Sequence, residues 1–146
     1  MSNHVHVPRV TPAGLLFGPN GNGKQYLSLN CHRGAGDPRY KSFWSPAIPP
    51  PVEYDVFCMA DNYNWSDQHG HYWAVHDGGN TELGTRGERL AKFPYNANPR
   101  DPWHGFPVSP LERGDADAPP DDFVANWIEA GVISKTVGRR IQRRRI

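Results

Sequence analysis

Prolines and glycines interrupt this chain so often that long helices and strands are excluded over most of its length. They number 15 each among the 146 residues. Proline removes a backbone donor and glycine weakens regular elements, so both favour turns. Five Trp, six Tyr and six Phe lie among these breaks, and aromatic rings supply large buried areas. We therefore expect short elements around an aromatic core rather than a disordered chain.

The length and the distribution of residue types predict one α+β domain over 1–146. Its β-rich body spans 1–95, a proline-rich wrap spans 94–120, and a helical pair spans 120–146. Nothing in the chain approaches 18 consecutive apolar residues, so no membrane-spanning helix and no membrane partner are expected.

Alternating apolar and polar residues predict an antiparallel sheet of about four to six strands between about residues 3 and 95. Turn formers at Gly18–Gly23 and Asp77–Asn80 indicate two hairpins. The strongest alternation places Tyr54, Val56 and Cys58 on one face of a strand. The predicted strands lie around Val5 and Val7 and at Leu15–Phe17, Tyr26–Cys31, Val52–Met59, His71–His76 and Leu83–Phe93.

Two proline-rich segments, 33–51 and 94–120, are expected to be irregular loops tied to the body by apolar side chains. The first ends in Pro49–Pro51, a run that favours polyproline II and an extended path. The expected anchors are Phe43 and Trp44 in the first segment, and Trp103, Phe106 and Val108 in the second.

The chain ends in two predicted helices, at about 120–130 and about 134–145. Prolines followed by acids at 119–122 favour a helix start. Gly131 can end the first helix and Ser134 can cap the second. Apolar residues at helical spacing give each helix an inward face, namely Phe123, Val124, Trp127 and Ile128 in the first, and Ile133, Val137 and Ile141 in the second.

Charge is distributed unevenly along the chain. The formal net charge is only +1, yet six of the 16 basic residues lie among the last twelve, which contain no acid. The first 134 residues therefore hold ten basic and all 15 acidic residues. An acidic body joined to a basic end favours binding to a polyanion or to an acidic protein surface. The basic residues of this end are Lys135, Arg139, Arg140, Arg143, Arg144 and Arg145.

The leading functional prediction is non-catalytic binding of nucleic acid, with these six residues as phosphate contacts rather than base readers. The helical pair has the outline of a helix-turn-helix, although a third supporting helix is not evident. Tyr63 and Trp65 share a side if their segment is extended, so both are candidates for stacking on bases. The alternative is a solvated terminal helix that covers the sheet.

Histidines offer an enzymatic alternative, a metal-independent, toxin-like ribonuclease. Cleavage through the 2′-hydroxyl needs a base and an acid, and paired histidines suit this near neutral pH. We assign the pair as His71 and His104, with Arg86 or Arg89 as a phosphate clamp.

Two further motifs are weaker. His69, His71 and His76 could join Cys58 or Cys31–His32 in a zinc site, but neither C-x-x-C nor H-x-x-x-H spacing occurs. Gly18–Lys24 matches G-x-x-x-x-G-K, the start of a phosphate-binding loop. Gln25 replaces the required Ser or Thr, and a strand pattern follows instead of a helix. We therefore expect a hairpin turn here and no metal or other cofactor.

A third functional class is a protein-binding immunity protein or phage-related inhibitor that acts through its acidic body. The first ten residues are polar and lack the apolar run of a secretory signal, so we expect a cytoplasmic protein with reduced Cys31 and Cys58. The sequence leaves open the choice between RNA and DNA, the oligomeric state and the strand order.

Overall fold

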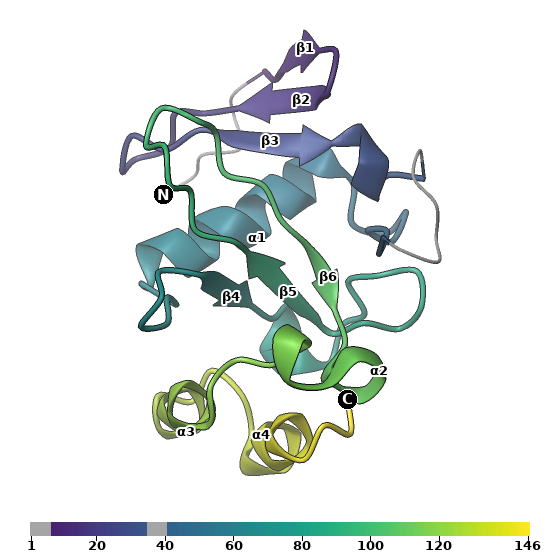
Figure 1. Ribbon diagram of the computed structural model, residues 1–146, viewed down its shortest axis with the longest axis vertical. Helices are drawn as coiled ribbons and strands as arrows, with labels where there is room; N and C mark the ends of the chain where they lie inside the picture. Colours follow the sequence, from purple (N-terminus) through teal and green to yellow (C-terminus); the bar gives the residue numbers. More distant parts are fainter. Residues whose placement is uncertain (1–6, 35–40) are drawn as a thin grey trace.

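The computed structural model describes residues 7–34 and 41–146 and arranges them in successive layers (Figure 1). Helix α1 lies between two antiparallel sheets, and the C-terminal helices cover the far side of the second sheet. The α+β class is confirmed, although the strands in these two ranges form two sheets of three instead of one larger sheet. The strands are β1 (Arg9–Thr11), β2 (Gly14–Phe17) and β3 (Tyr26–Leu29), then β4 (Tyr72–Ala74), β5 (Leu90–Phe93) and β6 (Phe106–Val108).

The helices are α1 (Pro50–Asn62), α2 (Pro110–Arg113), α3 (Asp121–Glu129) and α4 (Lys135–Gln142), with short 3-10 turns η1 (Asn30–His32), η2 (Asp77–Gly79) and η3 (Gly114–Asp117). Within the described residues, none of these helices has the length and apolar character needed to cross a membrane.

The first sheet contains the predicted hairpin, because β2 pairs with β3 from Gly14↔Leu29 to Phe17↔Tyr26. The strand expected around Val5 falls outside the described residues, and Val7 is not in a strand. In the second sheet β5 is the central strand and pairs with both β4 and β6. The proline-rich wrap is therefore not wholly irregular, since it contributes β6.

The predicted strand at Val52–Met59 is wrong, because these residues belong to α1. Pro50 and Pro51 occupy the first helical positions, where the missing N–H of proline costs no intrahelical hydrogen bond. Only Pro49 is extended, so the polyproline prediction fails for the other two prolines. Helix α1 is buried around most of its circumference, and such a helix lacks the one-sided apolar stripe that identifies helices in a sequence.

Alternate residues of β4 and the residue that follows it, Val75, enter two different cores. Tyr72 and Ala74 pack with α1, whereas Trp73 and Val75 pack with residues of α3 and α4. A strand buried on both faces keeps its position only if both layers are present. The second sheet therefore links α1 to the helices that carry the basic residues.

Trp44 and Trp103 anchor their loops as predicted. Trp44 is in the core and its Nε1 donates to the carbonyl of Gly105 at 3.2 Å. The backbone of Trp103 pairs with β3, since its carbonyl accepts from Leu27 N at 2.7 Å and its N–H donates to Gln25 O at 2.8 Å. The segment that leads into β6 thus joins the two sheets.

The C-terminal helical pair is confirmed, although α4 ends at Gln142 rather than near residue 145. Gly131 has the left-handed φ of +76° that favours glycine after a helix. Ser134 caps α4, because its side chain accepts from Val137 N at 3.1 Å. Gly138 allows the two helices to approach, since a Cβ atom there would lie 2.3 Å from Ile128 Cδ1. Glycine lowers helix propensity at this position but permits close packing of α4 on α3.

Candidate nucleic-acid interface

Helix α4 presents its cations on one side because its other side is buried. Ile141 is fully buried, and Ile133 and Val137 pack in the same core. The helix begins at the Ser134 cap and is fastened to α3 at Gly138. The basic side chains consequently project from a helix that the body supports.

A groove of about 700 Å³ runs over the outer side of this helix. No carboxylate is among the residues that line it. We call it the basic groove, and its lining residues are Lys135, Thr136, Arg139, Arg140, Arg143 and Arg145. Five cations around one groove produce the positive potential that attracts the phosphates of a nucleic acid.

Arg144 differs from the other five basic residues of the chain end. Its backbone has a φ of +57°, which turns the chain after α4. Its side chain ion-pairs with Asp115 at 2.9 Å, and Asp121 lies at 3.7 Å. The guanidinium also donates to the carbonyls of Ile141 and Gln142 at 3.1 and 2.9 Å. Arg144 therefore holds the C-terminal end of α4 onto the body and does not line the basic groove.

Tyr63 and Trp65 stack on each other, with ring centroids 5.7 Å apart and planes 21° apart. Trp65 also meets the edge of Trp127 and packs against both cores, so it has a structural role. Tyr63 is 70% exposed. The two rings line an aromatic groove of about 580 Å³, together with Phe123 of α3.

The aromatic groove and the basic groove lie on either side of the turn between α3 and α4. Gly131 and Val132 line the first, whereas Lys135 and Thr136 line the second. A stacking surface and a cationic surface are thus separated by a few residues of chain.

The proposed catalytic residues are distributed around the second sheet. His71 precedes β4 and His104 precedes β6, and the central strand β5 lies between these two outer strands. Nδ1 of His71 accepts the N–H of Tyr95 at 2.9 Å, which leaves the proton of the neutral ring on Nε2. Burial lowers the pKa of both histidines. Nδ1 of His104 is buried without a hydrogen-bond partner within the described part of the chain.

The two candidate phosphate clamps have different surroundings. Arg89 Nη1 donates to the carbonyls of Gly79 and Asn80 at 3.4 and 3.2 Å, so it supports the η2 turn. Arg86 lines a separate cavity next to β6. No hydrogen bond or ion pair joins either arginine to His71 or His104 among the residues described. A catalytic role for these four residues stays a prediction.

The segment Gly18–Lys24 connects two antiparallel strands, as expected for a hairpin turn. Its polar side chains converge on Asp61 of α1, which accepts from Asn20 at 2.9 Å and Asn22 at 2.8 Å and pairs with Lys24 at 2.9 Å. Burial alone would raise the pKa of Asp61, but these hydrogen bonds outweigh it and the pKa is lowered. The loop therefore attaches the first sheet to α1.

This role of Asp61 was not evident from the sequence. The only signal is the spacing of three side-chain donors, Asn20, Asn22 and Lys24, at every second position of the turn. Identifying their common acceptor requires α1 to be a helix that reaches this turn.

Part of the acidic charge of the body is internal. Glu53, Asp61 and Glu88 are buried, so they add little to an acidic outer surface. Binding of a protein through the acidic body stays a prediction.

The cysteines and histidines do not form a recognisable metal centre. Cys58 is buried in α1 and Cys31 is half-buried in η1, and both are free thiols. His69 and His71 have ring centroids 6.3 Å apart. Within residues 7–34 and 41–146, no three His, Cys, Asp or Glu side chains come together as metal ligands.

Comparisons with protein-family models, with curated proteins and with solved structures find no match to this chain. Its function must therefore be argued from its own residues.

Proposed function

We propose that this protein binds nucleic acid non-specifically through the basic groove of α4. The observation that carries the proposal is a groove lined by five cations and no acid, on a helix whose opposite side is buried. Each cation that neutralises a phosphate releases a counterion, which provides affinity without reading sequence. The five side chains are flexible and charged, so they suit backbone phosphates better than base edges.

The buried side of α4 makes substitution of exposed residues a better test than truncation. Truncation after Ser134 would remove Ile141, which is fully buried, and would disturb the core as well as the charge. Substitutions at exposed positions of the groove avoid this difficulty. Arg139 and Arg143 are both exposed.

The variant Arg139→Gln/Arg143→Gln should bind a labelled RNA oligonucleotide about 10- to 100-fold more weakly than the original chain at about 0.1 M salt, because two phosphate contacts are lost. Fluorescence polarisation measures the affinity. The matched control is Arg9→Gln/Arg100→Gln, which makes the same change in net charge at exposed positions outside the groove. Equal losses in the two variants would mean that only the net charge matters, and the groove would not be the site.

The exposed ring of Tyr63 supports a preference for single strands. A phosphate chain held in the basic groove can continue past the α3–α4 turn, where an unpaired base can stack on the outer face of Tyr63. Stacking of this kind is tolerant of sequence. We therefore infer that single-stranded RNA or DNA uses both grooves, whereas a duplex uses the basic groove alone.

Tyr63→Ala should weaken binding of a single strand about fivefold or more and leave duplex binding unchanged, since loss of one stacked base costs about 1–3 kcal/mol. The measurement is the same polarisation titration with strands of equal length. Tyr95→Ala provides the control, because Tyr95 is also an exposed tyrosine and does not line the aromatic groove. An equal effect of Tyr63→Ala on single and double strands would contradict the stacking role.

A further inference from the structure

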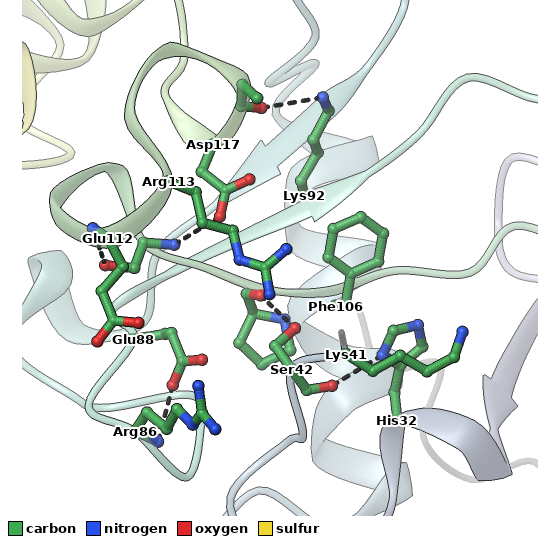
Figure 2. A pocket seen from close by; sticks show the side chains of 13 residues that line it. His32, Lys41, Ser42, Arg86, Glu88, Lys92, Phe106, Glu112, Arg113 and Asp117 are labelled. Atoms are coloured by element: carbon green, nitrogen blue, oxygen red, sulfur yellow. Dashed lines mark hydrogen bonds between the residues drawn. The ribbon is translucent and has the colours of Figure 1, made fainter. Parts of the chain in front are cut away.

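A second cationic cavity, of about 430 Å³, lies beside β6 (Figure 2). It shares no lining residue with the basic groove. Its walls come from the second sheet, from the turn before β5, from η1 and residues 41–42, and from α2 and η3. Its charged lining residues, apart from His32, are Lys41, Arg86, Lys92, Arg113, Glu88, Glu112 and Asp117.

The cavity is lined by four cations and three carboxylates, which leaves a formal excess of one positive charge, and the cations do not form close ion pairs with these acids. No ion pair within 4.0 Å joins any of these residues to another described residue. Two of the three carboxylates already accept backbone N–H groups: Glu88 accepts from Arg86 N at 2.8 Å and Asp117 accepts from Ser109 N at 3.0 Å. The positive charges therefore retain unused donors.

Only Lys92 among the four cations has a described side-chain hydrogen bond. Its Nζ lies 3.4 Å from the carbonyl of Ala116 and 5.1 Å from the ring centroid of Trp73. These contacts hold the ammonium at the cavity wall and leave further N–H donors available. Figure 2 shows Arg113 extending toward Phe106 and Ser42, so its guanidinium lies across the cavity.

One wall of the cavity is rigid and flat. His32 stacks on Phe106 with ring centroids 5.2 Å apart and planes 25° apart. Its Nδ1 donates to the carbonyl of Ser42 at 2.8 Å, and Ser42 Oγ donates to Pro107 O at 2.6 Å. Burial lowers the pKa of His32, so this ring is neutral at neutral pH. A ligand therefore meets an uncharged aromatic wall and, around it, the charged side chains of the cavity.

We propose that this cavity binds a small organic phosphate. Guanidinium groups match the geometry of phosphate oxygens and can donate two parallel hydrogen bonds to them. The volume falls in the range of small-molecule sites. The cavity is more highly charged than most such sites, which favours a charged ligand, and its one aromatic wall can receive an organic group. The aromatic wall of His32 and Phe106 receives the organic part, while Arg86, Arg113 and the two lysines contact the phosphate.

Calorimetric titration of the full chain with phenyl phosphate tests the proposal, with benzoate as a ligand that has the same ring but a singly charged carboxylate. We expect saturable binding of one phenyl phosphate and at least tenfold weaker binding of benzoate. Arg86→Gln/Arg113→Gln should weaken phenyl phosphate binding tenfold or more, since each arginine supplies charge-assisted hydrogen bonds worth about a factor of ten. Both arginines are exposed, so the variant should fold.

Two controls separate this cavity from the nucleic-acid interface. Arg9→Gln/Arg100→Gln makes the same change in net charge elsewhere, and Arg139→Gln/Arg143→Gln alters only the basic groove. Both should bind phenyl phosphate like the original chain, and the ring resonances of His32 and Phe106 should shift on binding. Three outcomes would overturn the proposal: phenyl phosphate does not bind saturably, benzoate binds with equal affinity, or the control variants lose as much affinity for phenyl phosphate as Arg86→Gln/Arg113→Gln does. None of these outcomes depends on whether α4 binds nucleic acid.

Discussion

Replacing Glu53 by alanine should lower the free energy of unfolding by about 3–5 kcal/mol, because it breaks a largely buried ion pair with Arg33 and leaves the buried hydroxyls of Tyr26 and Ser28 without their acceptor. Glu53 is fully buried in α1. It accepts hydrogen bonds from the hydroxyl of Tyr26, from Ser28 Oγ at 2.8 Å and from Arg33 at 2.7 Å. Tyr26 and Ser28 belong to β3, so the substitution weakens the attachment of the first sheet to α1.

Urea denaturation followed by tryptophan fluorescence measures this loss. Glu82→Ala removes an exposed glutamate and should change the free energy of unfolding by less than about 0.5 kcal/mol. Arg33→Ala on its own should also be strongly destabilising, whereas the double variant should lose less than the sum of the two single losses, because the two residues interact. If Glu53→Ala lowers the free energy of unfolding no more than Glu82→Ala does, the hydrogen bonds of Glu53 do not stabilise the fold as proposed.

Nucleic-acid affinity should fall steeply with salt. Five phosphate contacts predict a slope of log K against log[salt] of about −4.5 for duplex DNA and about −3.5 for single strands. Between about 50 and 200 mM salt, this corresponds to a loss of about 500-fold for the duplex and about 130-fold for the single strand. Polarisation titrations at four or more salt concentrations give the slope.

The salt series also tests which cations take part. Because Arg144 is bound to Asp115, we expect Arg144→Gln to leave the slope near that of the original chain. Arg139→Gln/Arg143→Gln should make the slope shallower by about two, one for each lost phosphate contact. A slope shallower than about −1 in the original chain would mean that at most one phosphate is neutralised, and the proposed function would fail.

Helix α1 is the element for which the sequence pattern predicted the wrong secondary structure. Tyr54, Val56 and Cys58 alternate as in a strand, yet they lie on a helix. A strip of α1 that includes Pro51, Met59 and Asn62 reaches solvent, but the rest of the helix is buried between the two sheets, so its apolar residues do not form a single one-sided stripe. The buried Glu53 and Asp61 made the helix harder to recognise, because their partners come from the distant first sheet.

In the candidate site, too, the sequence reveals some features and the tertiary structure decides others. The clustering of six cations is a property of the sequence alone. The separation of Arg144 from the other five depends on Asp115, 29 positions away, and on a positive φ after α4. The cavity beside β6 was not predicted, because its cations come from four separate segments. Only Arg86 among them was predicted to contact phosphate, and it was grouped with His71 and His104 instead.

By itself, the sequence determined what local interactions control: the first hairpin, the starts of the two C-terminal helices with the Gly131 stop and the Ser134 cap, the aromatic anchors Trp44 and Trp103, and the uneven distribution of charge. These features depend on residues a few positions apart, or on composition. Only the tertiary structure decided that α1 is a helix, that two small sheets replace one, and which cations share a groove or a cavity. Those outcomes depend on burial and charge pairing between distant segments, for which no local pattern of residues gives a signal.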